Sequence, residues 1–437
     1  MTPEAKNSID QIRYGNVPEG YVKTRSGITP TSWTPACLGD IYTERKEPGN
    51  ESLPLLTVSI HSGVSDGELD EDELPKKVKR IEDKSQYKRA ATGDLVFNMM
   101  RAWQGAIGTV RTEGMVSPAY IVAKPNDKVY PLFMDYYMKT PRMVGLINRQ
   151  SYGVTDFRKR LYWDSFAPIP CILPPVTEQR KIAEILAAQD KAIELQGRKI
   201  EELKRFKRGC LERMFPRKGQ KVPEKRFPGF TGNWEQRKFD KVITQITTGL
   251  NPRDNFTLNS GGNNYYVTIK NFEHGILHLD EKCDLVDEKA LRLIQARSDL
   301  KRDDILFTSI GRVGDCYLIK NTPNNWNINE SVFSLRPNKA VVEPEYLFHT
   351  IHSDIVLNQI LSNTTGSTFK SIKIGDLKNV IVPLPSKEEQ RQIANLVGAL
   401  ENLITLHQRK LEEMKKQKKA LMQLLLTGIV RTKGEEQ

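Results

Sequence analysis

The residues of this sequence that could do chemistry are basic, amide, hydroxyl and aromatic side chains in short segments, several of them next to glycines. Lys and Arg contact phosphates, while Arg, Asn, Gln, Ser and Thr can hydrogen-bond to base edges. In the first half of the chain these candidates are Arg101, Trp103, Gln104, Tyr152, Arg158, Lys159 and Arg160. In the second half they are Lys270, Asn271, Ser309, Arg312, Ser367, Lys370 and Ser371. Their recurrence at equivalent places favours a DNA-contacting surface in each half over ordinary solvated loops.

No catalytic or metal-binding motif stands out beside these clusters. Two pairs among the six histidines have helix-like spacing, but no cysteine or acid completes a metal site. Asp70 followed by Glu82-Asp83-Lys84 fits the acidic pattern of a nuclease only loosely, and a solvated acidic loop explains the region more simply. The sequence contains no P-loop and no Asn-Pro-Pro-aromatic tetrad of amino-methyltransferases. We therefore expect no catalytic residues, no metal and no cofactor in this chain.

Composition points to a polyanionic partner. The 437 residues carry 66 Lys and Arg against 54 Asp and Glu, a formal net charge of +12. Nucleic acid is the first candidate for such a partner. The five cysteines form no CxxC pair, which argues against both a disulfide framework and a zinc site. With no apolar run long enough to span a membrane, these features predict a cytoplasmic protein without a membrane partner.

Two stretches of about forty residues must position the clusters, and each resembles the other. Residues 174–215 align without a gap with 385–426, at an offset of 211 (389 − 178). Both read as one long helix with an apolar heptad seam. Two seam positions are polar in both copies, Gln196 with His407 and Lys207 with Lys418. Because polar seam residues can fix register and partner, we predict a coiled coil rather than two helices that each lie on their own domain.

The segments before the two helices also correspond, although they have diverged much further. Trp33 and Trp234 open them, and turn, strand and loop patterns then follow in the same order. The predicted fold class is α+β, two similar domains each followed by a long helix. The expected boundaries are an arm at 1–32, domains at 33–173 and 234–384, helices at 174–216 and 385–428, a linker at 217–233 and a tail at 429–437. The sequence leaves open whether the arm is ordered.

The chain resembles the specificity subunits of type I restriction-modification systems. The resemblance rests on the domain-and-helix repeat, on the start of the second helix at 383–390, and on the FPGFTGNWE segment at 227–235. It implies two α/β target recognition domains separated by two long antiparallel helices, with each domain reading one half of a split target in double-stranded DNA. It also implies a non-catalytic subunit.

The same resemblance implies partners. Two modification subunits would methylate adenine N6 with S-adenosylmethionine, and restriction subunits would add translocation and cleavage that depend on ATP and Mg²⁺, so that all three cofactors belong to partners. Two alternatives remain: a coiled-coil scaffold with two protein-binding heads, and a single-chain DNA nuclease. A scaffold leaves the +12 charge without a use, and a nuclease lacks its motifs.

Overall fold

The computed structural model divides into two compact units. Unit 1 comprises Met1–Gln196 with Lys410–Gln437, and unit 2 comprises Gly197–Arg409. The structure describes residues 3–24, 27–50, 52–60, 63–66, 86–153, 159–273, 275–366 and 369–432. Both units mix helices with strands, as the sequence predicts. Each of the two long helices, α6 (Val176–Met214) and α12 (Lys387–Leu426), contributes one part to each unit.

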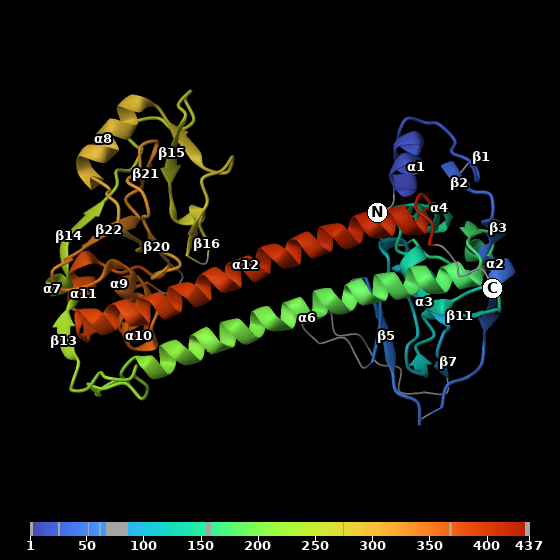
Figure 1. Cartoon of the computed structure of the whole chain (residues 1–437), viewed down its shortest axis with the longest axis horizontal. Helices are drawn as coiled ribbons and strands as arrows, with labels where there is room; N and C mark the ends of the chain where they lie inside the picture. The colour runs from blue at the N-terminus through green and yellow to red at the C-terminus, as the bar shows by residue number, and fades with distance from the viewer. Residues whose placement is uncertain are drawn as a thin grey trace. The chain divides into compact units, whose positions relative to one another are not determined.

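Unit 1 is built on an antiparallel four-stranded sheet in the order β4-β11-β8-β9, of which β11 is labelled in Figure 1. These strands are Tyr42–Arg45, Tyr120–Pro125, Leu95–Asn98 and Ile107–Thr109. Smaller pairs are β5 (Leu56–Ser59) with β6 (Gly63–Asp66), and β7 (Lys88–Ala90) with β10 (Gly114–Val116). The helices are α2 (Leu38–Ile41), α3 (Pro131–Tyr137), α4 (Pro141–Gln150) and α5 (Trp163–Phe166). The proline at the first position of α3, with its fixed φ, is preorganised to start that helix.

Residues 3–32 carry regular structure in their described part, which answers the question that the sequence left open. They contain helix α1 (Pro3–Arg13) and a hairpin of β1 (Tyr21–Thr24) with β2 (Gly27–Pro30). The Tyr21 hydroxyl donates to the Ile429 carbonyl at 3.1 Å. The hairpin is thereby attached to the segment that follows α12.

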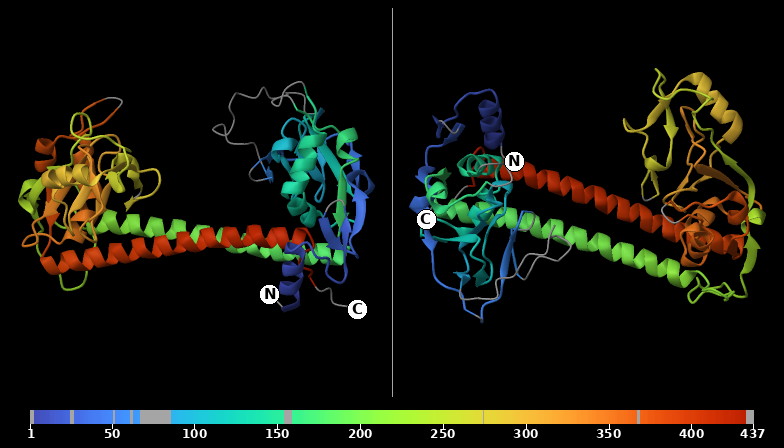
Figure 2. Two further views of the ribbon diagram at one scale, coloured as in Figure 1. Left: turned by 90° about the horizontal axis from the view of Figure 1, so that it is seen from above. Right: turned by 180° about the vertical axis from the view of Figure 1, so that it is seen from behind.

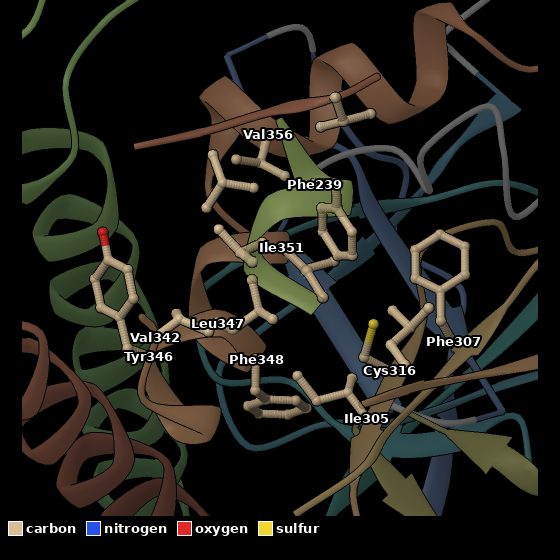
Figure 3. Packing of buried hydrophobic residues seen from close by; sticks show 14 of the residues in the cluster. Phe239, Ile305, Phe307, Cys316, Val342, Tyr346, Leu347, Phe348, Ile351 and Val356 are labelled. Carbon is tan, nitrogen blue, oxygen red and sulfur yellow. The ribbon is translucent and has the colours of Figure 1, made fainter. Parts of the chain in front are cut away.

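Unit 2 contains a sheet with the same order, β14-β22-β19-β20. Its strands are Ile243–Thr248, Val332–Pro337, Ile305–Thr308 and Cys316–Leu318, and its helices before α12 are α7 (Phe239–Val242), α8 (Glu288–Ser298), α9 (Pro344–Ile351), α10 (Asp354–Ser362) and α11 (Ile374–Lys378). Phe239, Phe307 and Phe348 pack with the aliphatic side chains of α9 in its core (Figure 3). Unit 2 adds a three-stranded sheet of β18 (Asp284–Val286), β15 (Asn264–Val267) and β21 (Trp326–Ile328), in which β15 and β21 run parallel. A short pair of β16 (Phe272–Glu273) with β17 (Ile276–Leu277) completes it.

A pair of strands closes each domain at the base of its long helix. In unit 1, β3 (Thr34–Cys37) pairs with β12 (Pro170–Leu173), which leads into α6. In unit 2, β13 (Glu235–Lys238) pairs with β23 (Ile381–Leu384), which leads into α12. The first strand of each domain is therefore hydrogen-bonded to its last.

A buried glutamine fixes the first turn of each long helix to its own domain. Gln179 accepts from the Tyr130 amide at 2.8 Å, and its amide group donates to the Lys128 and Pro174 carbonyls. Gln390 makes the same three bonds in unit 2, to the Glu343 amide and to the carbonyls of Val341 and Pro385. The side-chain oxygen and nitrogen of both buried glutamines are thus hydrogen-bonded to the backbone.

A buried glutamate beside each glutamine binds an arginine that lies beyond the end of the other long helix. In unit 1, the Glu178 carboxylate accepts hydrogen bonds from Nε and a terminal nitrogen of Arg431, at 2.7 and 2.8 Å. It also accepts one from the Trp33 indole N–H. In unit 2, Glu389 receives two bonds from Arg226, at 2.8 and 2.7 Å. Two parallel N–H···O bonds are the strongest geometry available to such a pair.

Apolar packing joins the same pieces. In unit 1, Ile182, Leu186 and Leu425 belong to one core cluster. In unit 2, Met214 belongs to the core cluster of Val397 and Leu400. Within each unit, the start of one long helix therefore lies beside the end of the other (Figure 2). No helix in the described part of the chain is long and apolar enough to cross a membrane.

The Arg226–Glu389 pair yields a stability prediction. Arg226→Ala should lower the free energy of unfolding by about 3–5 kcal/mol, because it leaves a carboxylate that is 1% exposed without its counter-charge. Urea unfolding followed by circular dichroism measures this. Arg237→Ala is the matched control, since its pair with Glu235 is exposed and should contribute less than about 1 kcal/mol. Equal midpoints for the two variants would contradict the structural role of the buried pair.

Candidate nucleic-acid interface

In unit 1, two of the predicted segments meet at the end of strand β8. The Leu161 amide donates to the Met99 carbonyl at 2.9 Å, which holds segment 159–162 against loop 98–105. Tyr152 and Arg160 exchange two backbone hydrogen bonds, which join Tyr152 to segment 159–162. The turn of the first loop ends at Gly105, whose φ of 102° is a conformation that other residues rarely adopt.

Aromatic and basic side chains meet where these loops touch. The Lys159 ammonium lies 5.7 Å from the centre of the Trp103 ring, a cation–π contact, and donates to the Asn148 side chain at 3.3 Å. The Trp103 indole N–H donates to the Met100 carbonyl, which fixes the ring. Tyr152 is 59% exposed, with its ring 5.5 Å from that of Tyr162. Stacking faces and cations side by side are what nucleic-acid surfaces use.

In unit 2, three segments converge at the equivalent end of strand β19. The Ile372 amide donates to the Ser309 carbonyl at 2.9 Å, and the Gly311 amide donates to the Lys370 carbonyl at 2.8 Å. A third segment, 268–273, joins through Arg312. The guanidinium donates to the Ile269 carbonyl at 3.3 Å and to the Phe272 carbonyl, and it pairs with Asp315 at 3.3 Å.

The backbone frame of the two sites is the same. The bond from Leu161 to Met99 in unit 1 corresponds to the bond from Ile372 to Ser309 in unit 2. At the same positions, the Met99 amide donates to Ala119, and the Ser309 amide donates to Ser331, each at 3.0 Å. The Tyr152–Arg160 bridge likewise corresponds to a bridge between Thr365 and Ser371. One framework therefore carries different side chains in the two units.

Three of the predicted contact residues make hydrogen bonds within the protein that hold the loops together. Asn271 is buried, where its side chain accepts from the Thr268 amide and donates to the Cys283 sulfur. Ser309 is buried and donates to the Ser331 carbonyl. The Arg312 side chain is 55% exposed, yet its head group is bound to two carbonyls and a carboxylate. These residues hold the loops in shape, a distinction that residue type alone does not reveal.

The other predicted residues lie at the surface or at its edge. Arg101, Gln104, Tyr152, Arg160, Lys270 and Lys370 are exposed, and Trp103, Lys159 and Ser371 are partly exposed. Arg158 and Ser367 lie outside the described residues. Segments 98–105 and 159–162 therefore share one site in unit 1, and segments 268–273, 308–315 and 369–372 share one site in unit 2.

Sequence reasoning missed the apolar residues of these loops. Phe369 is 74% exposed beside Lys370, and Ile310 and Met100 occupy equivalent exposed positions, each directly after the residue whose carbonyl joins the loops. Exposed apolar side chains in a basic loop can contact thymine methyl groups or wedge between bases. The signal available in the sequence was an aromatic residue between polar neighbours shortly after a glycine, GSTFKS at 366–371.

A family model described as the type I restriction modification DNA specificity domain matches residues 232–416. The putative MjaX specificity subunit of Methanocaldococcus jannaschii, a type I restriction enzyme subunit, is 26% identical over 454 aligned residues, which cover 95% of this chain and 97% of the relative. The EcoKI specificity subunit of Escherichia coli is 24% identical and covers 88% of this chain and 83% of that protein.

Solved structures share the fold. The S subunit of a type I restriction-modification system from M. genitalium aligns with a TM-score of 0.54 at 12% identity, over 90% of this chain and 96% of that one. A chain from a structural study of the assembly of a type I R-M system aligns with a TM-score of 0.56 at 19% identity, over 92% of this chain and 99% of that one.

Arg312 and Lys370 should behave differently when each is truncated in the absence of any ligand. Arg312→Ala removes a charged donor from two carbonyls, a loss of about 1.5–3 kcal/mol of local stability. Backbone amides of 268–273 should then exchange with solvent at least about tenfold faster. Lys370→Ala should leave their exchange unchanged, since the Lys370 side chain is exposed to solvent. Hydrogen exchange read by mass spectrometry measures both, and equal protection in the two variants would show that Arg312 does not hold the segment.

Proposed function

We infer that this chain is a specificity subunit of a type I restriction-modification system and that it recognises a DNA target with two separate surfaces, one in each unit. The observation that carries the proposal is the common loop framework at the end of β8 and β19. It presents exposed basic and aromatic side chains in both units. The net charge of +12 supports a duplex as the partner, because phosphate neutralisation supplies most of the sequence-independent affinity.

We propose that the two surfaces read different half-targets. The frame is shared, but the side chains on it differ: Trp103, Lys159 and Arg160 in unit 1, against Lys270, Phe369 and Lys370 in unit 2. Unit 2 also carries the β18-β15-β21 sheet and α8, and the 268–273 segment follows directly from β15. Base readout depends on which side chains reach the groove. Two versions of one frame with different side chains therefore suit a split target.

The proposal includes an antiparallel coiled coil of α6 and α12. Support comes from each unit separately, because each contains the start of one helix packed with the end of the other. The bidentate pairs Glu178–Arg431 and Glu389–Arg226 connect the same pieces. In this arrangement the helices are the common scaffold on which both recognition domains are built.

Chemistry belongs to partner subunits in this proposal. Two modification subunits would bring S-adenosylmethionine for methyl transfer to adenine N6, and restriction subunits would bring the ATP- and Mg²⁺-dependent steps. A repeated exposed position on the helices supports a repeated docking site. Leu195 on α6 and Leu406 on α12 are equivalent residues (406 − 195 = 211), and they are 51% and 61% exposed. Ile185 and Leu403 are further exposed apolar residues on these two helices.

DNA binding tests the proposed function directly. The target is first identified by mapping methylated adenines in cells that carry the complete system. Lys370→Ala should then weaken binding of the assembled complex to that target. The slope of log K against log salt concentration should become shallower by about 1, the loss of one phosphate contact. Asp354→Asn serves as a control, because it lies on α10 rather than on the loops. Affinity and salt slope that are unchanged for both Lys370→Ala and Arg160→Ala would remove these loops from the interface.

Partner docking is tested on the helices. Leu195→Glu with Leu406→Glu should reduce co-purification of modification subunits at least about tenfold, because a charge would be buried at each contact. The thermal midpoint of the isolated chain should fall little, since both side chains are exposed. Glu202→Gln with Glu413→Gln is the matched control on the same helices. A double Leu variant that assembles normally would place the modification subunits elsewhere.

A further inference from the structure

The lysines in the apolar seam are not isolated. In unit 1, the Lys418 ammonium of α12 contacts a carboxylate oxygen of Asp190 on α6 at 2.5 Å. The Tyr136 hydroxyl, from α3 of the domain, donates to the other oxygen of Asp190 at 2.7 Å. The ammonium also lies 5.4 Å from the centre of the Tyr136 ring. Three elements thus meet at one carboxylate.

Unit 2 contains a second junction with the charges exchanged between the helices. Here Lys207 belongs to α6 and donates to Glu401 of α12 at 2.9 Å. His349, from α9 of the domain, places Nδ1 3.6 Å from the same oxygen of Glu401. Burial lowers the pKa of His349 to about 4, so near neutral pH the ring is uncharged and the charge partner of Glu401 is Lys207.

The two junctions occupy corresponding positions. The acids differ by 211 (401 − 190), as do the lysines (418 − 207), and Tyr136 and His349 are the sixth residues of helices that both begin with proline. In each helix the junction lysine therefore lies seventeen positions after the junction acid (207 − 190 and 418 − 401). With this spacing, only antiparallel helices bring both acids opposite lysines.

Parallel helices in the same repeat register would give the opposite result. Asp190 would then face Glu401, and Lys207 would face Lys418. Like charges in a partly buried seam repel, and each would lose the counter-charge that offsets its desolvation. A shift of one heptad in the antiparallel arrangement would separate both pairs. The two junctions thus distinguish direction and register, which a purely apolar heptad seam does far less well.

We propose that Tyr136–Asp190–Lys418 and His349–Glu401–Lys207 are positioning junctions that select antiparallel helix pairing and seat each recognition domain on it. This inference rests on the coiled coil proposed above. The lysine and acid fix the helices against each other, and the tyrosine or histidine attaches the domain at that same point. Each domain is thereby oriented by the contact that sets the register.

The test is a charge exchange in the full chain. Asp190→Lys places two lysines together and should make the amides of 131–137 in α3 exchange with solvent at least tenfold faster. Lys418→Glu should do the same by placing two acids together. The double variant Asp190→Lys with Lys418→Glu restores the opposite-charge pair between the helices, so its urea midpoint should return to near that of the original chain while both single variants fall below it. In the double variant α3 should stay less protected, because Tyr136 has lost its carboxylate acceptor.

Milder variants and a control keep the test informative if a charge reversal prevents folding. Lys418→Met removes the charge and keeps an apolar seam. Tyr136→Phe removes only the hydroxyl, so in that variant α3 should lose protection while the Lys418–Asp190 pair persists. Glu201→Lys makes the same charge reversal within an exposed pair on α6 and should change exchange less than twofold. A urea midpoint of the double variant that stays as low as those of the single variants, or full protection of α3 in all single variants, would overturn the proposal.

Urea unfolding and hydrogen exchange separate this inference from the DNA-binding proposal, because neither needs DNA. If the charge exchange rescues the urea midpoint but the assembled complex binds no duplex, the junctions stand and the proposed function fails. If DNA binds normally and the rescue fails, the function stands and the junctions do not.

Discussion

The bidentate pairing of a buried glutamate with an arginine at the base of each long helix is the interaction on which the other contacts depend. Glu178 and Glu389 stand at the first turns of α6 and α12, where each also adjoins the glutamine that binds its domain. An unpaired carboxylate at either place would be strongly destabilising. Each domain is therefore stable only when the segment beyond the other long helix, which brings Arg431 or Arg226, is in place.

This dependence makes the two halves of the chain cooperative. Unit 1 takes its last helical piece from the C-terminal end of the sequence, and unit 2 takes the end of α6. The arm before Trp33 joins in, since Tyr21 binds the backbone at Ile429. With the cores closed in this way, the loops at the ends of β8 and β19 can carry different side chains without loss of the frame, because their shared hydrogen bonds are made by backbone.

Much of the organisation followed from the sequence alone. The two long helices, expected at 174–216 and 385–428, lie at Val176–Met214 and Lys387–Leu426. Their apolar spacing is a local signal, and local signals depend on neighbours along the chain. Net charge and the paired loops similarly indicated a nucleic-acid partner. The polar seam lysines were visible as exceptions to the heptad pattern, but the acids that bind them are more than a hundred residues away and had no signature.

The tertiary structure decided which polar residues face solvent and which hold the fold. Asn271, Ser309 and Arg312 have the residue types of a DNA-reading surface, yet backbone groups or a buried sulfur bind their side chains. Lys370 and Arg160 have the same chemistry and remain exposed. The reason is physical: a hydrogen-bonding side chain serves whichever partner folding brings within about 3 Å. Composition and periodicity, which determined the repeat and the helices, contain no information about that distance.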